Sequence, residues 1–213
     1  MLLGEVTSGI VVIFMFILGI LLTRHYVVGR HVYTFWWAIS FWLAFIAAVT
    51  DFISYLTLDW TLFQYRLYLF AAATLVAYMG AGTVYLFSRR LGHAYVAVMT
   101  LIALAMIVTL LITPIPGIGS LSPGEKAQHF VPSAIVIYFA LLSGIGAISI
   151  FLGAIYSFIR THRSFYLWIA LGALVFSVGG SIGSAVGVYE LFYVFQAIGS
   201  VILYYGIAKS FRK

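Results

Sequence analysis

Basic residues recur at regular intervals along the chain, and this pattern restricts the fold more than any other feature. Nine of the eleven Lys and Arg residues form four clusters: Arg24 with Arg30, Arg89 with Arg90, Arg160 with Arg163, and Lys209 with Arg212 and Lys213. Each interval between clusters has room for two apolar crossings of about 20 residues. Because cytoplasmic loops of membrane proteins are rich in Lys and Arg, the pattern predicts seven crossings, with the N-terminus outside and the C-terminus in the cytoplasm.

The composition supports a membrane protein. Charged residues make up 8% of the chain and hydrophobic residues 64%, whereas a soluble domain has roughly 25% charged residues. We therefore expect an all-α, polytopic seven-helix bundle that forms one transmembrane domain over residues 1–213 in the cell (cytoplasmic) membrane. The net charge of +6 suits anionic lipid headgroups, and the lack of a large solvated basic face excludes nucleic-acid binding.

Seven apolar segments are expected to form the crossings. They cover residues 6–23, 32–55, 62–87, 94–113, 132–159, 165–186 and 189–210. The longest connection, residues 114–131, contains or adjoins all four prolines, which stop helices and favour turns.

A weak internal similarity relates residues 6–90 to residues 132–213, with residues 94–113 as a linking helix. It pairs Trp36 with Trp168, and Gly82 with Gly206. Two interpretations stay open: a parallel 3+1+3 duplication, or coincidence among apolar residues. A duplication implies a pseudo-twofold axis along the membrane normal, as in other parallel-repeat transporters.

Polar residues near the expected external end form the best candidate ligand site. The set is Asp51, Arg66, Glu190 and Gln196, with Thr50 and Ser54. An ionised carboxylate inside a membrane is costly unless it is paired or hydrated, so Asp51 is expected to face the interior, with Arg66 as its partner. Two interpretations remain: an external pocket for a small polar ligand, or a structural ion pair that orients helices.

Small residues form a second group. Gly179, Gly183 and Gly187 repeat every four residues in the sixth segment, which allows close approach of a neighbouring helix. We expect them to pack the bundle, with homodimerisation as the alternative. The candidates for the same role are Gly144, Gly146 and Gly153 in the fifth segment, and Ala77, Gly80, Ala81 and Gly82 in the third.

Several chemistries are not expected. The five histidines lie at membrane edges, so no pair is placed to bind a haem inside the bilayer. Lys209 lies at the end of the last segment and not at its middle, which argues against a retinal Schiff base. Asp51 stands nearly alone at membrane depth, so a metal centre, a cofactor and enzymatic activity are not predicted.

Two resemblances rest on short segments. Residues 30–37, 65–68 and 85–90 resemble helices two and three of the seven-transmembrane sensor module that precedes some bacterial histidine kinases. Residues 170–173, 179–181 and 189–193 are similar to uncharacterised, stand-alone seven-helix proteins of bacteria and archaea. The resemblance implies a membrane-embedded sensing or ligand-binding module. The PQ-loop sugar transporters share the 3+1+3 layout, but they carry prolines in the repeated helices, and the first three segments here have none.

The function expected from the sequence is a ligand-binding or sensory module that acts through a partner protein. Its partners would be the lipid bilayer, a small polar ligand on the external side, and a second copy or another membrane protein. The alternatives are a small-solute transporter built from two three-helix repeats and a structural subunit of a membrane complex. Transport needs a polar path open to both sides, and the visible polarity is concentrated at the external end, which favours binding.

Overall fold

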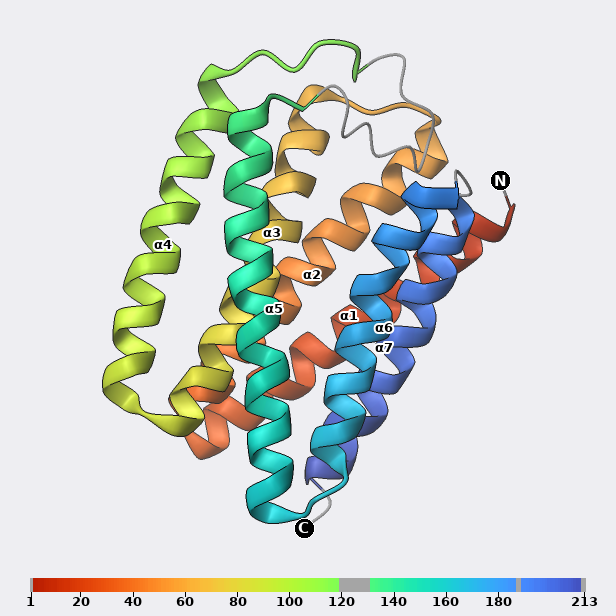
Figure 1. Cartoon of the computed structure of the whole chain (residues 1–213). Coiled ribbons are helices and arrows are strands. Elements are labelled where there is room, and N and C mark those ends of the chain that lie inside the picture. Colours follow the sequence, from red (N-terminus) through yellow and green to blue (C-terminus); the bar gives the residue numbers. More distant parts are fainter. Residues whose placement is uncertain (1, 119–130, 187–188, 212–213) are drawn as a thin grey trace.

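The computed structural model describes residues 2–118, 131–186 and 189–211, and all its regular structure is helical (Figure 1). Side chains are described for residues 5–118, 131–176 and 194–209. The helices are α1 (Leu2–Gly29), α2 (Val32–Thr57), α3 (Leu62–Phe87), α4 (Arg89–Ile112), α5 (Ser133–Thr161), α6 (Phe165–Val186) and α7 (Tyr189–Phe211). They run alternately up and down the bundle. We call the end with the N-terminus the N-side and the opposite end the C-side.

Helix boundaries differ from the prediction mainly in α1 and α4. The first helix was expected to end at residue 23, but it continues to Gly29 and stops where Arg30 adopts φ 48° and donates its N–H to the Tyr26 carbonyl at 2.7 Å. This left-handed residue is a common way to end a helix. The fourth helix starts five residues earlier than predicted because Ser88 caps it, accepting the N–H of Leu91 at 3.4 Å.

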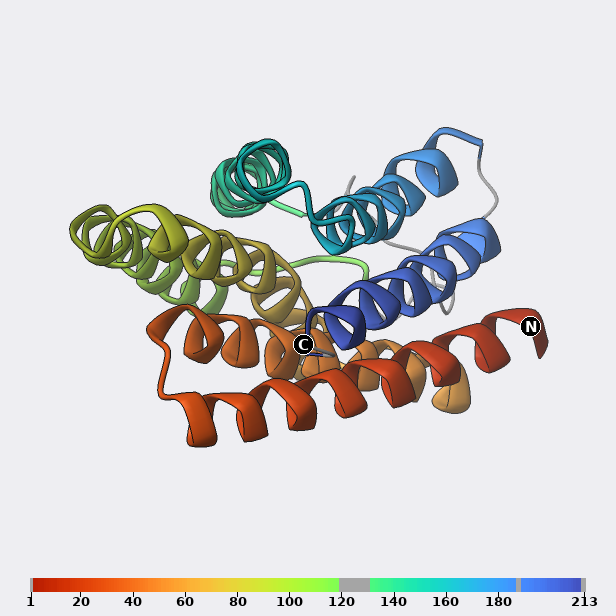
Figure 2. The same ribbon diagram turned by 90° about the horizontal axis from the view of Figure 1, so that it is seen from below.

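The third helix occupies the centre of the arrangement. It packs against α2, α4 and α5, while α1 lies against α2 and α7, and α6 contacts mainly α7 (Figure 2). Ala71, Ala73 and Ala77 of α3 are fully buried. These small side chains allow three neighbouring helices to approach α3 at the same time.

The bundle has the properties of a membrane protein. In the described residues, α1 to α5 are long and apolar enough to cross a bilayer, whereas the searched apolar stretches of α6 and α7 are the shorter segments Phe165–Phe176 and Val194–Lys209. Large apolar side chains such as Leu101, Leu111 and Ile159 project outward and are mostly exposed. An all-helical fold is therefore confirmed for the described residues, with five helices long and apolar enough to cross a membrane. The seven-crossing count, the orientation and the repeat stay predictions.

Glycines allow the closest helix contacts. A Cβ added to Gly146 of α5 would lie 2.5 Å from the Val76 carbonyl oxygen of α3, and one added to Gly80 would lie 3.0 Å from the Gly146 carbonyl. A Cβ on Gly153 would collide with Thr83. The packing role predicted for these glycines is confirmed, but it is wrong for Gly144, which has no atom within 4 Å of such a Cβ.

Candidate functional site

Asp51 lies in a buried part of α2 near its N-side end. Its residue is 3% exposed, and six residues separate it from the end of the helix at Thr57, which corresponds to a depth of about 9 Å at 1.5 Å per residue. Thr50 donates its hydroxyl to the Ala47 carbonyl at 2.8 Å, and Ser54 donates to the carbonyl of Asp51 at 2.7 Å. Both hydroxyl protons are therefore engaged by backbone carbonyls of α2, and both oxygens keep lone pairs that can accept a hydrogen bond.

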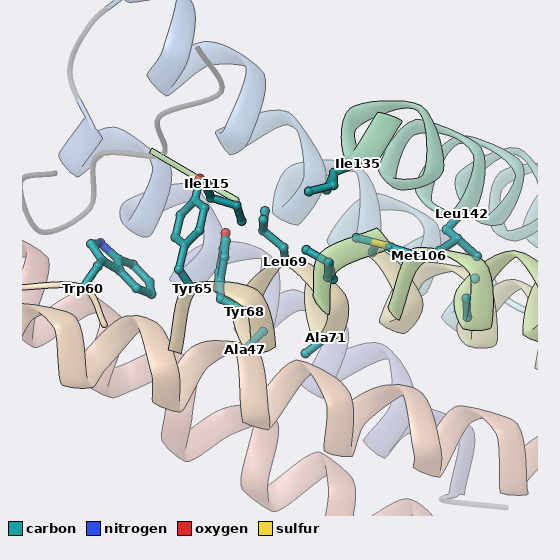
Figure 3. Packing of buried hydrophobic residues seen from close by; sticks show 14 of the residues in the cluster. Ala47, Trp60, Tyr65, Tyr68, Leu69, Ala71, Met106, Ile115, Ile135 and Leu142 are labelled. Carbon is teal, nitrogen blue, oxygen red and sulfur yellow. The ribbon is translucent and has the colours of Figure 1, made fainter. Parts of the chain in front are cut away.

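Three aromatic side chains, Trp60, Tyr65 and Tyr68, lie side by side at the start of α3 (Figure 3). The Trp60 ring packs edge-on against Tyr65, with centroids 5.5 Å apart, and lies 5.7 Å from the Tyr68 ring. Tyr68 also interacts electrostatically with Asp51 across the α2–α3 interface. Asp51 is thus coupled to a buried aromatic group on α3.

Trp60 carries a buried donor. The residue is 2% exposed, and its Nε1–H has no acceptor among the described residues. Its backbone N–H is held by the Asp59 carboxylate at 2.7 Å, in the turn that connects α2 to α3. By residue type and position near a helix end, Trp60 and Tyr65 would be read from the sequence as interfacial anchors. The sequence signal that could have indicated inward packing is the three-residue spacing of Tyr65 and Tyr68, which places both on one face of a helix.

Arg66 is oriented toward α4. Its Nη2 donates to the Thr113 carbonyl at 3.1 Å, at the end of that helix, while its buried Nε has no acceptor in the described part of the chain. The partner expected from the sequence was Asp51. The described hydrogen bond goes instead to a helix C-terminus, where the unpaired carbonyls and the macrodipole favour a cation.

The two remaining candidates, Gln196 and Glu190, lie on the last helix, α7. Gln196 is half-buried, and its backbone carbonyl accepts a hydrogen bond from the Ser200 hydroxyl at 2.7 Å. It lies on α7, which packs mainly against α6 and α1. Glu190 lies in the first turn of α7, and its side chain is outside the described residues. We use the name N-side polar layer for the remaining group: Thr50, Asp51, Ser54, Trp60, Tyr65, Arg66 and Tyr68.

The glycines predicted for the sixth helix are only partly placed. Gly179 and Gly183 lie within α6, but their surroundings are outside the described residues, as is Gly187 itself. Their proposed packing role stays a prediction. The close approaches that are described include contacts at α1–α2, α2–α3, α3–α4, α3–α5 and α6–α7.

The N-side polar layer combines an acceptor with donors that lack acceptors. A buried donor without an acceptor costs about 1–3 kcal/mol. A ligand that supplied the missing acceptor would therefore bind favourably here. The described residues contain no group of three or more His, Asp or Glu side chains suited to a metal ion. No family model, curated protein or solved structure matches the chain. Its function must therefore be inferred from this geometry.

Proposed function

We propose that the chain is a membrane-embedded module that binds a small polar ligand from the external side and acts through a partner protein. The observation that carries the proposal is a pair of buried N–H donors without an acceptor in the described residues, Trp60 Nε1 and Arg66 Nε, at the end of the bundle where Asp51 is also buried. Burying such groups in an apolar bundle costs several kcal/mol. A ligand with an acceptor group would compensate the cost of the two unpaired donors, and a cationic or donor group on the same ligand would add a charge-assisted contact to Asp51.

The proposal includes a topology of seven crossings, with the N-side external and the C-side cytoplasmic. It is supported by the position of the basic residues at helix ends. Arg24, Arg89 and Arg160 lie at the C-side ends of α1, α4 and α5, as expected for cytoplasmic loops. In this orientation, the N-side polar layer lies within reach of the external solution.

A thermal-shift screen in detergent tests the proposal. Small polar compounds, such as amino acids, amines and organic acids, are added to the wild-type protein and to Asp51→Asn. A specific ligand at 100 times its dissociation constant should stabilise the wild type by about 2.7 kcal/mol. Glu5→Gln is the matched control, because Glu5 is another N-side carboxylate but is only partly buried. A compound that stabilises all three proteins equally contradicts the proposal, as does a screen without any hit.

A transporter built from two three-helix halves is the second candidate, and the packing of two helix pairs supports it. Gly82 of α3 faces Trp37 of α2. At the paired position, a Cβ added to Gly206 of α7 would lie 2.9 Å from the backbone nitrogen of Ile169 in α6. Trp37 and Ile169 are themselves paired, because Ile169 lies 132 positions later, the offset that aligns Trp36 with Trp168.

A second pair of contacts has the same correspondence. The Ser40 hydroxyl of α2 donates to the Leu75 carbonyl of α3 at 2.6 Å. At the paired positions, a Cβ on Gly172 of α6 would lie 3.1 Å from the Gly199 carbonyl of α7. The α2–α3 pair and the α6–α7 pair therefore bring corresponding residues into contact. This agreement supports a duplication.

The small size and apolar walls of the cavity between the two halves favour ligand binding over transport. A cavity of about 30 Å³ is lined by residues of six helices, including the paired positions Met79 and Leu203. Its walls are almost entirely apolar, whereas a polar solute needs polar groups along its path. Uptake of a screened ligand into proteoliposomes would favour the transporter, and binding without uptake favours the sensory module.

A further inference from the structure

The α1–α2 and α5–α6 pairs turn in the same way on the C-side. Arg30 follows α1 with φ 48°, and His162, 132 positions later, follows α5 with φ 52°. Each donates its N–H to the carbonyl four residues earlier, Tyr26 or Phe158, at 2.7 Å. A shift of 132 residues therefore compares equivalent positions of the two pairs.

The α1–α2 pair is closed by a tryptophan. A Cβ on Gly19 would lie 3.2 Å from the Trp42 ring, so the glycine allows the indole to pack directly on the α1 backbone. The Trp42 Nε1–H donates to the Thr23 hydroxyl at 3.0 Å. Phe16 packs edge-on against the same indole, at 5.8 Å between centroids.

The α5–α6 pair has different residues at these positions and is open. Phe151 replaces Gly19, Leu174 replaces Trp42 and Ile155 replaces Thr23. A bulky side chain thus replaces the glycine, and both the indole and its hydroxyl acceptor are absent. Figure 1 shows α5 and α6 joined at the C-side and diverging toward the N-side.

A cavity occupies the space between the diverging helices. It measures about 480 Å³, and its lining includes Val76 of α3, Ala147, Phe151 and Leu152 of α5, and Ala170 and Leu174 of α6. This volume is typical of small-molecule sites, which measure about 300–1,000 Å³. Every lining side chain is apolar, and Phe151 and Leu174 are nearly half exposed, so the cavity is accessible from the apolar surface of the bundle.

The charge at the C-side end of this groove indicates its occupant. Arg160 lies on α5 and Arg163 in the following turn, both exposed. Arg160 is eight residues from Leu152, or about 12 Å along the helix. Nearby, Lys209 of α7 donates to the Ser164 hydroxyl at 3.1 Å. Three cations thus lie on the C-side of this cavity, beyond the lining residues of α5 and α6.

We propose that the α5–α6 groove binds an acyl chain of an anionic phospholipid whose headgroup lies on Arg160 and Arg163. The apolar walls exclude water from the chain, and basic residues near a membrane surface attract anionic headgroups. The groove is separate from the N-side polar layer, so this lipid site and the ligand site are independent.

Photo-crosslinking tests the proposal. The protein is placed in nanodiscs of phosphatidylcholine that contain a trace of phosphatidylglycerol or phosphatidylcholine with a diazirine in one acyl chain. The phosphatidylglycerol probe should label the α5 and α6 peptides at the groove. Arg160→Gln with Arg163→Gln should reduce occupancy about thirtyfold at subsaturating probe, from roughly 1 kcal/mol for each basic residue. Arg89→Gln with Arg90→Gln, at another C-side turn, is the matched control and should label normally.

A second variant tests the groove itself. Ala147→Trp should fill the cavity and abolish labelling, whereas Ala97→Trp, at an exposed alanine of α4, should have no effect. If Ala147→Trp does not fold, Ala170→Ile serves as a milder filling change. Equal labelling by the phosphatidylcholine probe overturns the proposal, as does labelling that survives in a folded filling variant. Crosslinks from the groove to a second copy or a copurifying protein would also overturn it, because a helix would then fill the groove.

Discussion

Substitution of Gly146 by alanine should weaken the contact between α3 and α5. The new Cβ would lie 2.5 Å from the Val76 carbonyl oxygen and 2.8 Å from the Ala77 nitrogen, whereas ordinary contacts begin at 3.4 Å. Both neighbours are backbone atoms, so the helices must separate by roughly 0.9 Å. Overpacking of this kind costs about 1–3 kcal/mol, and lipid cannot replace the contacts that are lost.

Gly144 provides the control on the same helix. A Cβ there meets no atom within 4 Å, and alanine favours a helix over glycine by about 1 kcal/mol, so Gly144→Ala should be neutral or stabilising. Reversible unfolding in mixed micelles, followed by circular dichroism, measures the free energy of unfolding of both variants and the wild type. Equal stability of the two variants would refute the close α3–α5 contact at Gly146.

Two further predictions concern the topology and the start of α3. The chain has no cysteine, so single cysteines placed at the exposed residues Thr57 and Ser164 should react with an impermeant maleimide in intact cells only at Thr57; reaction of both would contradict the orientation. Thr61 and Gln64 form a capping box in which the Thr61 hydroxyl accepts the Gln64 N–H at 3.2 Å, so Thr61→Ala should lower the unfolding free energy by about 0.5–2 kcal/mol, and an unchanged value would contradict a role of this cap in stability.

The fold class could be predicted because it depends on long patterns. The basic clusters and the apolar segments between them gave the helical membrane protein, and the bounds of α3 were predicted as the structure has them, Leu62–Phe87. Helix ends that depend on the conformation or side chain of a single residue were not predicted. Nothing in the composition shows that Ser88 caps α4, or that Arg30 adopts the left-handed conformation that ends α1.

The candidate site was only partly predictable. The cost of a carboxylate in the membrane identified Asp51 as an interior residue, and its 3% exposure agrees. The hydrogen bond of Arg66 to Thr113 could not be predicted, because it depends on how α4 ends beside α3 in space. Residue type alone places Trp60 at the membrane interface, but it packs inward against Tyr65 and Tyr68. Only its tertiary neighbours distinguish the two roles.

The central claim is that Asp51 belongs to a ligand site. Calorimetric titration of the best compound from the thermal-shift screen into the wild type and Asp51→Asn tests it most directly. A hydrogen bond to a charged group contributes about 1.5–3 kcal/mol, so the variant should bind roughly 10- to 150-fold more weakly while circular dichroism shows an intact fold. Equal dissociation constants for the two proteins would contradict the claim and leave Asp51 as a structural residue.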